Sequence, residues 1–325
     1  MKKIDFQDKH FRLLPDVADA ERLFKNSVRM IEIEVFSYCN RKCWFCPNAQ
    51  IDRNSQNIFM DEALYLKILR ELAKINYNQV ISFSRYNEPL ADKIILKRLQ
   101  QAKEILPLAK LHTNSNGDFV TAEYIKELYR HGLRSLKIQA YLAKDEPYQD
   151  EQVMSKIKKK AEQIGFPYKI VKCKSGRHHE VQLFYEDMDI HIYSRNFELD
   201  GCSRGELVDV RREYQRTAPC LVPFGDIYID YSGKVMPCCN LRSDAPEHQR
   251  FIVGDANQET LFQIYANGPL VGWRQRLFDF GPKGRPCNTC SFKIQKKNGP
   301  YVLAKIRLQF MKMGKGNKNR TVDGN

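Results

Sequence analysis

Residues 37–48, SYCNRKCWFCPN, place three cysteines, Cys39, Cys43 and Cys46, in one short stretch with no fourth cysteine close by. The preceding residues 28–36, VRMIEIEVF, are rich in Val, Ile and Met and alternate with polar residues, which predicts a buried strand. The cysteines therefore follow the carboxyl end of a strand. In α/β proteins this end of the sheet is where ligands bind.

Strand and helix patterns alternate from residue 28 to about residue 195. Repeated units of this length predict an α/β fold with a parallel sheet, either open or curled into a partial (β/α) barrel. The expected strands are residues 28–36, 79–85, 109–117, 133–142 and 167–173, and the expected helices are residues 60–75, 92–105, 121–132 and 151–164.

The pattern changes toward the carboxyl end of the chain. Residues 179–195 predict two further strands, with an antiparallel pairing left open. Residues 225–240 predict a β-hairpin that turns at residues 231–233. Residues 259–280 predict a helix interrupted at Gly268-Pro269. We therefore expect a smaller hairpin and helix module after the sheet domain.

Composition limits the class of protein. With 325 residues, of which 42% are hydrophobic, the chain can bury a sizeable core, which excludes a disordered or fibrous protein. No apolar run approaches the roughly 20 residues of a membrane span, and the first residues lack the apolar segment of a signal peptide. The sequence therefore predicts a cytoplasmic protein. A net charge of +14 allows for an anionic partner, although a solvated surface and a basic tail are the simpler explanation.

The 10 cysteines are grouped rather than scattered. In a reducing compartment, clustered cysteines hold metal or do chemistry more often than they form disulfides. Three thiolates are one short of a closed zinc site. They would leave one iron of a 4Fe–4S cluster open to bind a further ligand.

The Cys39-xxx-Cys43-xx-Cys46 spacing, with Phe45 before the last cysteine, resembles the signature of the radical S-adenosylmethionine (SAM) superfamily. The resemblance implies a 4Fe–4S cluster on these three cysteines and SAM bound to its open iron. It also implies an electron donor such as flavodoxin or ferredoxin. The alternatives are a zinc knuckle with a distant fourth ligand and three unrelated cysteines.

Two further segments are similar to motifs of the same family. Residues 82–90, SFSRYNEPL, resemble its Gly-Gly-Glu-Pro segment, which implies that Glu88 holds the SAM ammonium, although Arg85 and Asn87 stand where glycines are usual. Residues 112–117 resemble its Thr-Asn-Gly segment, so that Asn114 or Ser115 would touch SAM or substrate, unless this is an ordinary turn. The resemblance also places Phe45 at the SAM site.

A second group of cysteines could form a four-thiolate cage, for which spacing alone permits zinc or iron–sulfur. In a chain of this family the group resembles the SPASM/twitch extension, which implies an auxiliary 4Fe–4S cluster and two clusters in all. The shorter twitch form fits best because no cysteine follows the last pair. The candidate ligands are Cys220, Cys238, Cys287 and Cys290.

Cys202 and Cys239 are left over. Each is a candidate hydrogen-atom donor to a substrate radical, and each could equally be a plain buried cysteine. The chain divides into an N-terminal extension (1–27), a radical SAM core (28–210), a twitch-like module (211–300) and a basic tail (301–325) expected to be partly disordered.

The resemblance implies a radical oxidoreductase or epimerase. Peptide-maturing relatives usually carry a peptide-binding domain before the core, and 27 residues precede the first expected strand. We therefore expect a small polar substrate, such as a sugar, an aminocyclitol or a nucleotide-sugar, an anionic one included. The alternatives are a peptide- or RNA-modifying radical enzyme and a non-catalytic zinc or iron–sulfur protein.

Overall fold

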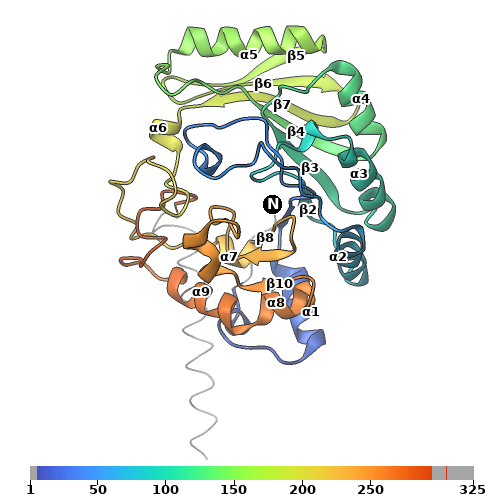
Figure 1. Ribbon diagram of the computed structural model, residues 1–325, viewed down its shortest axis with the longest axis vertical. Coiled ribbons are helices and arrows are strands. Elements are labelled where there is room, and N and C mark those ends of the chain that lie inside the picture. The colour runs from blue at the N-terminus through green and yellow to red at the C-terminus, as the bar shows by residue number, and fades with distance from the viewer. Residues whose placement is uncertain (1–5, 295–304, 306–325) are drawn as a thin grey trace, which may run out of the picture.

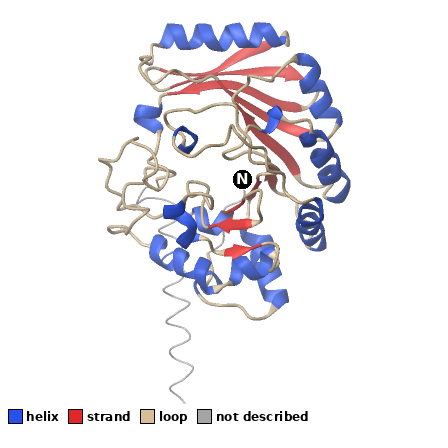
Figure 2. Cartoon of the chain, in the orientation of Figure 1, coloured by secondary structure: helices blue, strands red, loops and turns tan. Residues whose placement is uncertain are grey.

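The computed structural model describes residues 6–294 and residue 305. Its centre is one sheet of ten strands in the order β10-β9-β8-β1-β2-β3-β4-β7-β6-β5. The sheet is curved, with helices on its outer face, as Figure 2 shows. This is the expected partial (β/α) barrel followed by a small hairpin and helix module. The expected tail, residues 301–325, lies outside the described residues except for residue 305.

The middle of the sheet is parallel, as predicted. Helices follow its strands and cover the outer face, and the long loop after β1 lies on the inner side (Figure 1). The strands are β1 (Met30–Ile33), β2 (Val80–Ser82), β3 (Lys110–Ser115) and β4 (Leu133–Gln139), and the helices are α2 (Glu62–Lys74), α3 (Ile94–Ile105), α4 (Ala122–Arg130) and α5 (Asp150–Ile164).

Local sequence explains where these helices begin and end. The side chain of Asp61 accepts a hydrogen bond from the backbone N–H of Leu64 at the start of α2, and Thr121 does the same for Tyr124 at the start of α4. Gly165 ends α5 in the left-handed region with φ of 80°, which favours glycine.

One edge of the sheet departs from the predicted parallel pattern. β7 (Met188–Arg195) pairs parallel with β4, but β6 (His178–Tyr185) pairs antiparallel with β7. β5 (Tyr168–Lys174) pairs antiparallel with β6, so the expectation that residues 167–173 continue the parallel sheet was wrong. The reason is the short turn between β5 and β6, since a parallel neighbour needs a crossover of a dozen residues or more.

At the other end, the carboxyl-terminal module joins the same sheet through β1. β8 (Asp226–Ile229) pairs parallel with β1 over four residues. β8 and β9 (Lys234–Met236) form the predicted hairpin, and the short β10 (Gly254–Asp255) extends it. Gly233 adopts φ of 89° in the turn, where an added Cβ would lie 2.5 Å from the Asn257 side chain.

The N-terminal segment forms a helix that the sequence analysis did not predict, α1 (Val17–Ser27). Its Phe24 makes edge contacts with Phe262 and Tyr265 of α8 (Leu261–Ala266). α9 (Gly268–Phe278) follows α8 directly, which confirms the interrupted helix. The remaining short helices are η1 (Asp8–Phe11), η2 (Pro47–Ala49), η3 (Pro89–Ala91), α6 (Phe197–Asp200), α7 (Val222–Gly225) and η4 (Pro246–Phe251). No helix among the described residues is long and apolar enough to cross a membrane.

Candidate active site

The three-cysteine loop (residues 37–48) folds back on itself at the carboxyl end of β1. The backbone N–H of Cys46 donates to the carbonyl of Cys43 at 2.9 Å, and that of Cys39 donates to Arg53 at 2.9 Å. Burial raises the pKa of Cys39 to about 12 and that of Cys43 to about 11. Thiols in such a place become thiolates only when a bound metal supplies positive charge, so the donor set suits a metal site.

Among the described residues, no three Cys, His, Asp or Glu side chains converge closely enough to hold a single metal ion. A cluster of four irons spreads its ligands further apart than a mononuclear site does. The loop therefore offers three thiols from one side of a cavity without forming a ready zinc cage.

The loop after β2 is shaped by Glu34, which the sequence analysis missed. Glu34 is fully buried, and its Oε1 accepts hydrogen bonds from the backbone N–H groups of Tyr86 (2.6 Å) and Asn87 (3.0 Å). None of residues 85–88 has a positive φ. The loop therefore does not need the glycines usual at Arg85 and Asn87, because a carboxylate satisfies its N–H groups.

Glu88 is buried beside this loop and lines the same cavity as the three cysteines. Its Oε1 accepts from the hydroxyl of Ser115 (2.8 Å) and the N–H of Leu90 (3.1 Å), and its Oε2 accepts from the N–H of Asn116 (2.7 Å). Burial raises the pKa of Glu88, although these hydrogen bonds oppose the shift. Oε2 keeps one acceptor position, which fits an ammonium group.

The other expected SAM contacts line this cavity too, with different roles. The side chain of Asn114 donates to the hydroxyl of Ser84 at 2.9 Å. Ser115 is buried and holds Glu88 as described. Phe45 is buried and stacked on Phe197, with ring centroids 3.6 Å apart, so it presents apolar surface beside the cysteines.

The second cysteine group comes together from three segments of the module. Burial raises the pKa of Cys238 well above its usual value, and the nearby thiols of Cys239, Cys287 and Cys220 contribute to the shift. Burial likewise raises the pKa of Cys287 to about 12. These thiols lie within electrostatic reach of one another, as candidate ligands of one cluster would.

The structure separates the two spare cysteines. Cys202 lies beside Cys290, and the interaction of the two thiols lowers the pKa of Cys202 and raises that of Cys290. The Sγ of Cys202 also lies 3.5 Å from Oδ1 of Asn240. Cys239 instead lines a large cavity that Glu32 also lines. Of the two, Cys239 is the one that faces open space on the inner side of the sheet.

Two cavities meet on that inner side. The smaller, of about 260 Å³, is lined by the three cysteines and Glu88. The larger, of about 690 Å³, lies against β1, β2, β3, β4, β6 and β7. The residues that line both are Arg85, Asn114, Tyr193, Arg195 and Phe292.

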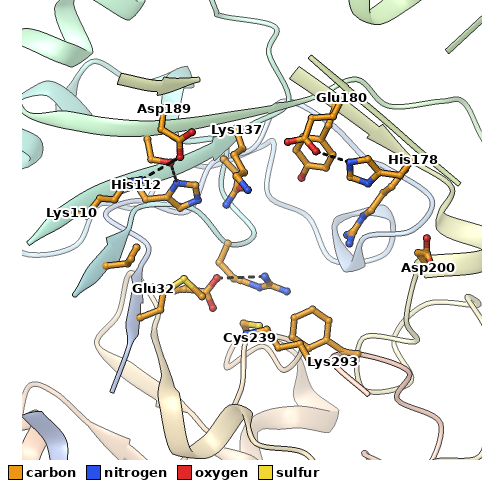
Figure 3. A pocket seen from close by; sticks show the side chains of 18 residues that line it. Glu32, Lys110, His112, Lys137, His178, Glu180, Asp189, Asp200, Cys239 and Lys293 are labelled. Carbon is orange, nitrogen blue, oxygen red and sulfur yellow. Dashed lines mark hydrogen bonds and ion pairs between the residues drawn. The ribbon is translucent and has the colours of Figure 1, made fainter. Parts of the chain in front are cut away.

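Polar side chains line the wall of the larger cavity, with Glu180 beside His178 and, apart from them, Asp189 beside Lys110 (Figure 3). Glu180 lies 2.9 Å from His178 and 2.7 Å from His191, and His191 lies 2.8 Å from Asp189. Asp189 in turn pairs with Lys110 at 3.2 Å. The sequence analysis did not predict this group of polar side chains. Residues 178 and 180 alternate along β6 and residues 189 and 191 along β7, so the four share one face of the sheet.

Buried arginine contacts join the module to the three-cysteine loop. Arg53 lies 2.9 Å from Asp244 and 3.4 Å from Glu34. Arg242 pairs with Asp244 at 2.7 Å and donates to Asn48 of the loop at 2.7 Å. Burial alone would raise the pKa of Asp244, but the hydrogen bond from Arg242 and the charge of Arg53 lower it to about 2.

The sequence places both regions in known families. Residues 33–163 match the model of the radical SAM superfamily, and residues 220–291 match the SPASM iron–sulfur cluster-binding domain. The chain is a radical SAM enzyme. It therefore belongs to proteins that bind SAM and a 4Fe–4S cluster, which sets aside the alternative of a non-catalytic metal-binding protein.

Relatives extend this match to most of the chain. The S-adenosyl-L-methionine-dependent 2-deoxy-scyllo-inosamine dehydrogenase of Niallia circulans is 25% identical over 285 residues, which is 84% of this radical SAM chain and 98% of the relative. The structure of BtrN in complex with AdoMet and 2-DOIA superposes with a TM-score of 0.60 at 21% identity, over 84% of this chain and 97% of that one. BtrN in an open conformation gives a TM-score of 0.51 at 22% identity, over 77% and 85%. These structures support the fold.

Proposed function

We propose that this enzyme uses SAM to oxidise a hydroxyl-bearing carbon of a small polar substrate, such as a sugar or an aminocyclitol. The observation that carries the proposal is the junction of the two cavities, which share five lining residues. A substrate in the larger cavity would therefore lie beside SAM in the smaller one. The name of the relative from Niallia circulans, a dehydrogenase, supports oxidation.

The residues of the smaller cavity fit SAM and a cluster. Cys39, Cys43 and Cys46 would hold the cluster, and Oε2 of Glu88 would accept a hydrogen bond from the SAM ammonium. Phe45, packed under Phe197, would keep water from the cysteines. When bound, the cluster and SAM supply a 5′-deoxyadenosyl radical that takes a hydrogen atom from the substrate.

The remaining electron and proton need acceptors. Cys220, Cys238, Cys287 and Cys290 would hold a second 4Fe–4S cluster, and four protein ligands would limit it to electron transfer or structure. This makes two clusters in all. Within the proposal, the core spans residues 28–210 and the module residues 211–300. Flavodoxin or ferredoxin would supply the reducing electron.

Glu32 is suited to accept the proton. It is buried at the wall of the larger cavity, and its Oε2 has no hydrogen-bond partner among the described residues. Burial raises its pKa, while Arg85 at 3.6 Å opposes the shift. A buried carboxylate with a raised pKa is a better base for a hydroxyl proton than an exposed one.

Epimerisation is the second candidate, because the thiol of Cys239 faces the larger cavity. In that reaction the thiol would return a hydrogen atom to the opposite face of the substrate carbon. A reaction in D₂O separates the two: epimerisation puts deuterium at the inverted carbon through the exchangeable thiol, whereas oxidation yields a carbonyl.

The experiment is anaerobic reconstitution with iron, sulfide and a reductant, followed by assay of SAM cleavage with a panel of polyols and aminocyclitols. Substrate-dependent formation of 5′-deoxyadenosine together with a carbonyl product supports oxidation. RNA retained by the purified protein, or SAM cleavage stimulated only by RNA or a peptide, would instead favour those alternatives.

A further inference from the structure

The larger cavity carries more positive than negative charge once its internal ion pairs are counted. Each acidic residue on its wall has a basic or histidine partner: Asp189 pairs with Lys110 at 3.2 Å, Asp200 with Arg177 at 2.7 Å, and Glu180 with two histidines. Glu32 faces Arg85 at 3.6 Å, and Lys293 pairs with Asp226 at 2.5 Å.

Two cations on the wall remain without a carboxylate partner among the described residues, Lys137 and Arg195. Lys137 is half-buried in β4, and Figure 3 shows it pointing into the cavity. Arg195 ends β7 opposite His178, and its Nε is buried without a hydrogen-bond partner in the part of the chain that the structure describes. Desolvation lowers the pKa of Arg195, and the charge of Arg204 contributes to the shift.

His112 lies on the neighbouring strand β3 and lines the same cavity. Burial is the main cause that lowers the pKa of His112 to about 4, and the charges of Lys137 and Lys110 contribute to this lowering. Arg85 adds a third cation, whose buried Nε has no hydrogen-bond partner in residues 6–294.

SAM cannot neutralise the cations on this wall, because its sulfonium adds a positive charge of its own. Arg85, Lys137 and Arg195 contribute three positive charges, and Glu32 at most one negative charge. These four groups therefore leave a net charge of at least +2 in the cavity. A phosphate monoester carries about −1.5 to −2 at neutral pH and offers three acceptor oxygens, whereas a carboxylate carries one charge.

We propose that the substrate carries a phosphate group, held by Lys137 and Arg195 with Arg85 beside them. This inference rests on the proposed function, since it takes the larger cavity as the substrate site. Lys137 pairs with His191, four residues before Arg195, so the two positions lie about 13 Å apart along the sheet. The long side chains of Lys137 and Arg195 can both reach one phosphate that lies between them. The sugar or cyclitol ring would then lie against Glu180 and His178.

The test is binding of inorganic phosphate and of paired probes to the reconstituted protein, by calorimetry. We expect phosphate to bind and to compete with glucose 6-phosphate, and glucose to bind at least 10-fold more weakly than its phosphate. Lys137→Gln and Arg195→Gln should each weaken glucose 6-phosphate binding about 10-fold, because each removes a charge-assisted hydrogen bond. Iron content should not change. Lys172→Gln, which removes an exposed charge on β5, is the matched control.

Absence of phosphate binding by the wild-type protein overturns the proposal, and so does equal binding of glucose and glucose 6-phosphate. Stronger competition by glucuronate than by phosphate would assign the site to a carboxylate and overturn the phosphate assignment. SAM cleavage by the wild-type protein is measured separately. If SAM cleavage is absent, the proposed function is wrong whether or not the protein binds an anion. If it is present without anion binding, only this inference fails.

Discussion

The hydroxyl of Ser115 donates a hydrogen bond of 2.8 Å to Oε1 of Glu88 and so ties the end of β3 to the loop after β2. With the N–H of Asn116 on the other oxygen, it fixes the carboxylate toward the smaller cavity. A carboxylate held by neighbours in this way loses little entropy when it binds a cation.

We expect Glu88→Gln to weaken SAM binding about 10-fold or more, because a charge-assisted hydrogen bond to the ammonium is lost. Equilibrium dialysis with reconstituted protein measures this, and iron content should not change. Ser115→Ala leaves the carboxylate present but less restrained, so it should weaken SAM binding by less than Glu88→Gln does. Unaltered SAM affinity in Glu88→Gln would mean that the ammonium is held elsewhere.

Replacing Cys39, Cys43 and Cys46 together by Ala should lower bound iron from about eight to about four per chain, since only the cluster of the module remains. SAM cleavage should be lost. Iron and zinc analysis of the purified proteins checks both statements. A wild-type protein with one cluster and one tightly bound zinc would contradict the assignment of the second cysteine group.

Cys202→Ser and Cys239→Ser should behave differently, because the structure gives the two thiols different neighbours. Cys202 contacts Cys290, so its replacement should shift the reduction potential of the module's cluster in a redox titration followed by EPR. If the reaction is an oxidation, Cys239→Ser keeps turnover. If it is an epimerisation, the variant consumes SAM without inverting the substrate.

Asp244→Asn should destabilise the protein in a pH-dependent way. The pKa of Asp244 is lowered to about 2, so its ionised form adds stability above the unfolded-state pKa near 4 and loses it as the pH falls toward 2. A pKa lowered from near 4 to about 2 corresponds to roughly 2.5 kcal/mol at pH 7. Chemical unfolding at pH 7 and at pH 3 should show the difference between variant and wild type shrinking at the lower pH. An equal difference at both pH values would contradict this.

Local signals were enough to predict most of the fold. The spacing of Cys39, Cys43 and Cys46 indicated the family, and the alternation of strands and helices gave the parallel centre of the sheet. The helix α1 was missed, although Asp16 caps it and Ala20, Leu23 and Phe24 share one face. Such a short pattern is a weak signal until its partner, α8, is known.

The buried polar contacts could not be predicted from the sequence, because they join distant positions. Arg53 and Asp244 are 191 residues apart. Glu34 also looked like an ordinary polar residue in a strand, but the fold places it under the N–H groups of Tyr86 and Asn87. Pairing of this kind depends on tertiary structure, and the sequence pattern alone gives only the face on which a residue lies.

The pairing of β1 with β8 has a consequence for how the chain folds. β1 is among the first strands to leave the ribosome, yet one of its two neighbours, Asp226–Ile229, is made almost 200 residues later. Contacts so far apart in sequence make folding slow, because a long loop must close before they form. Until β8 arrives, β1 has an unpaired edge next to three reduced cysteines. We therefore expect the nascent chain to be prone to aggregation and oxidation in this interval, which makes co-expression of chaperones and iron–sulfur assembly proteins the first measure for obtaining intact enzyme.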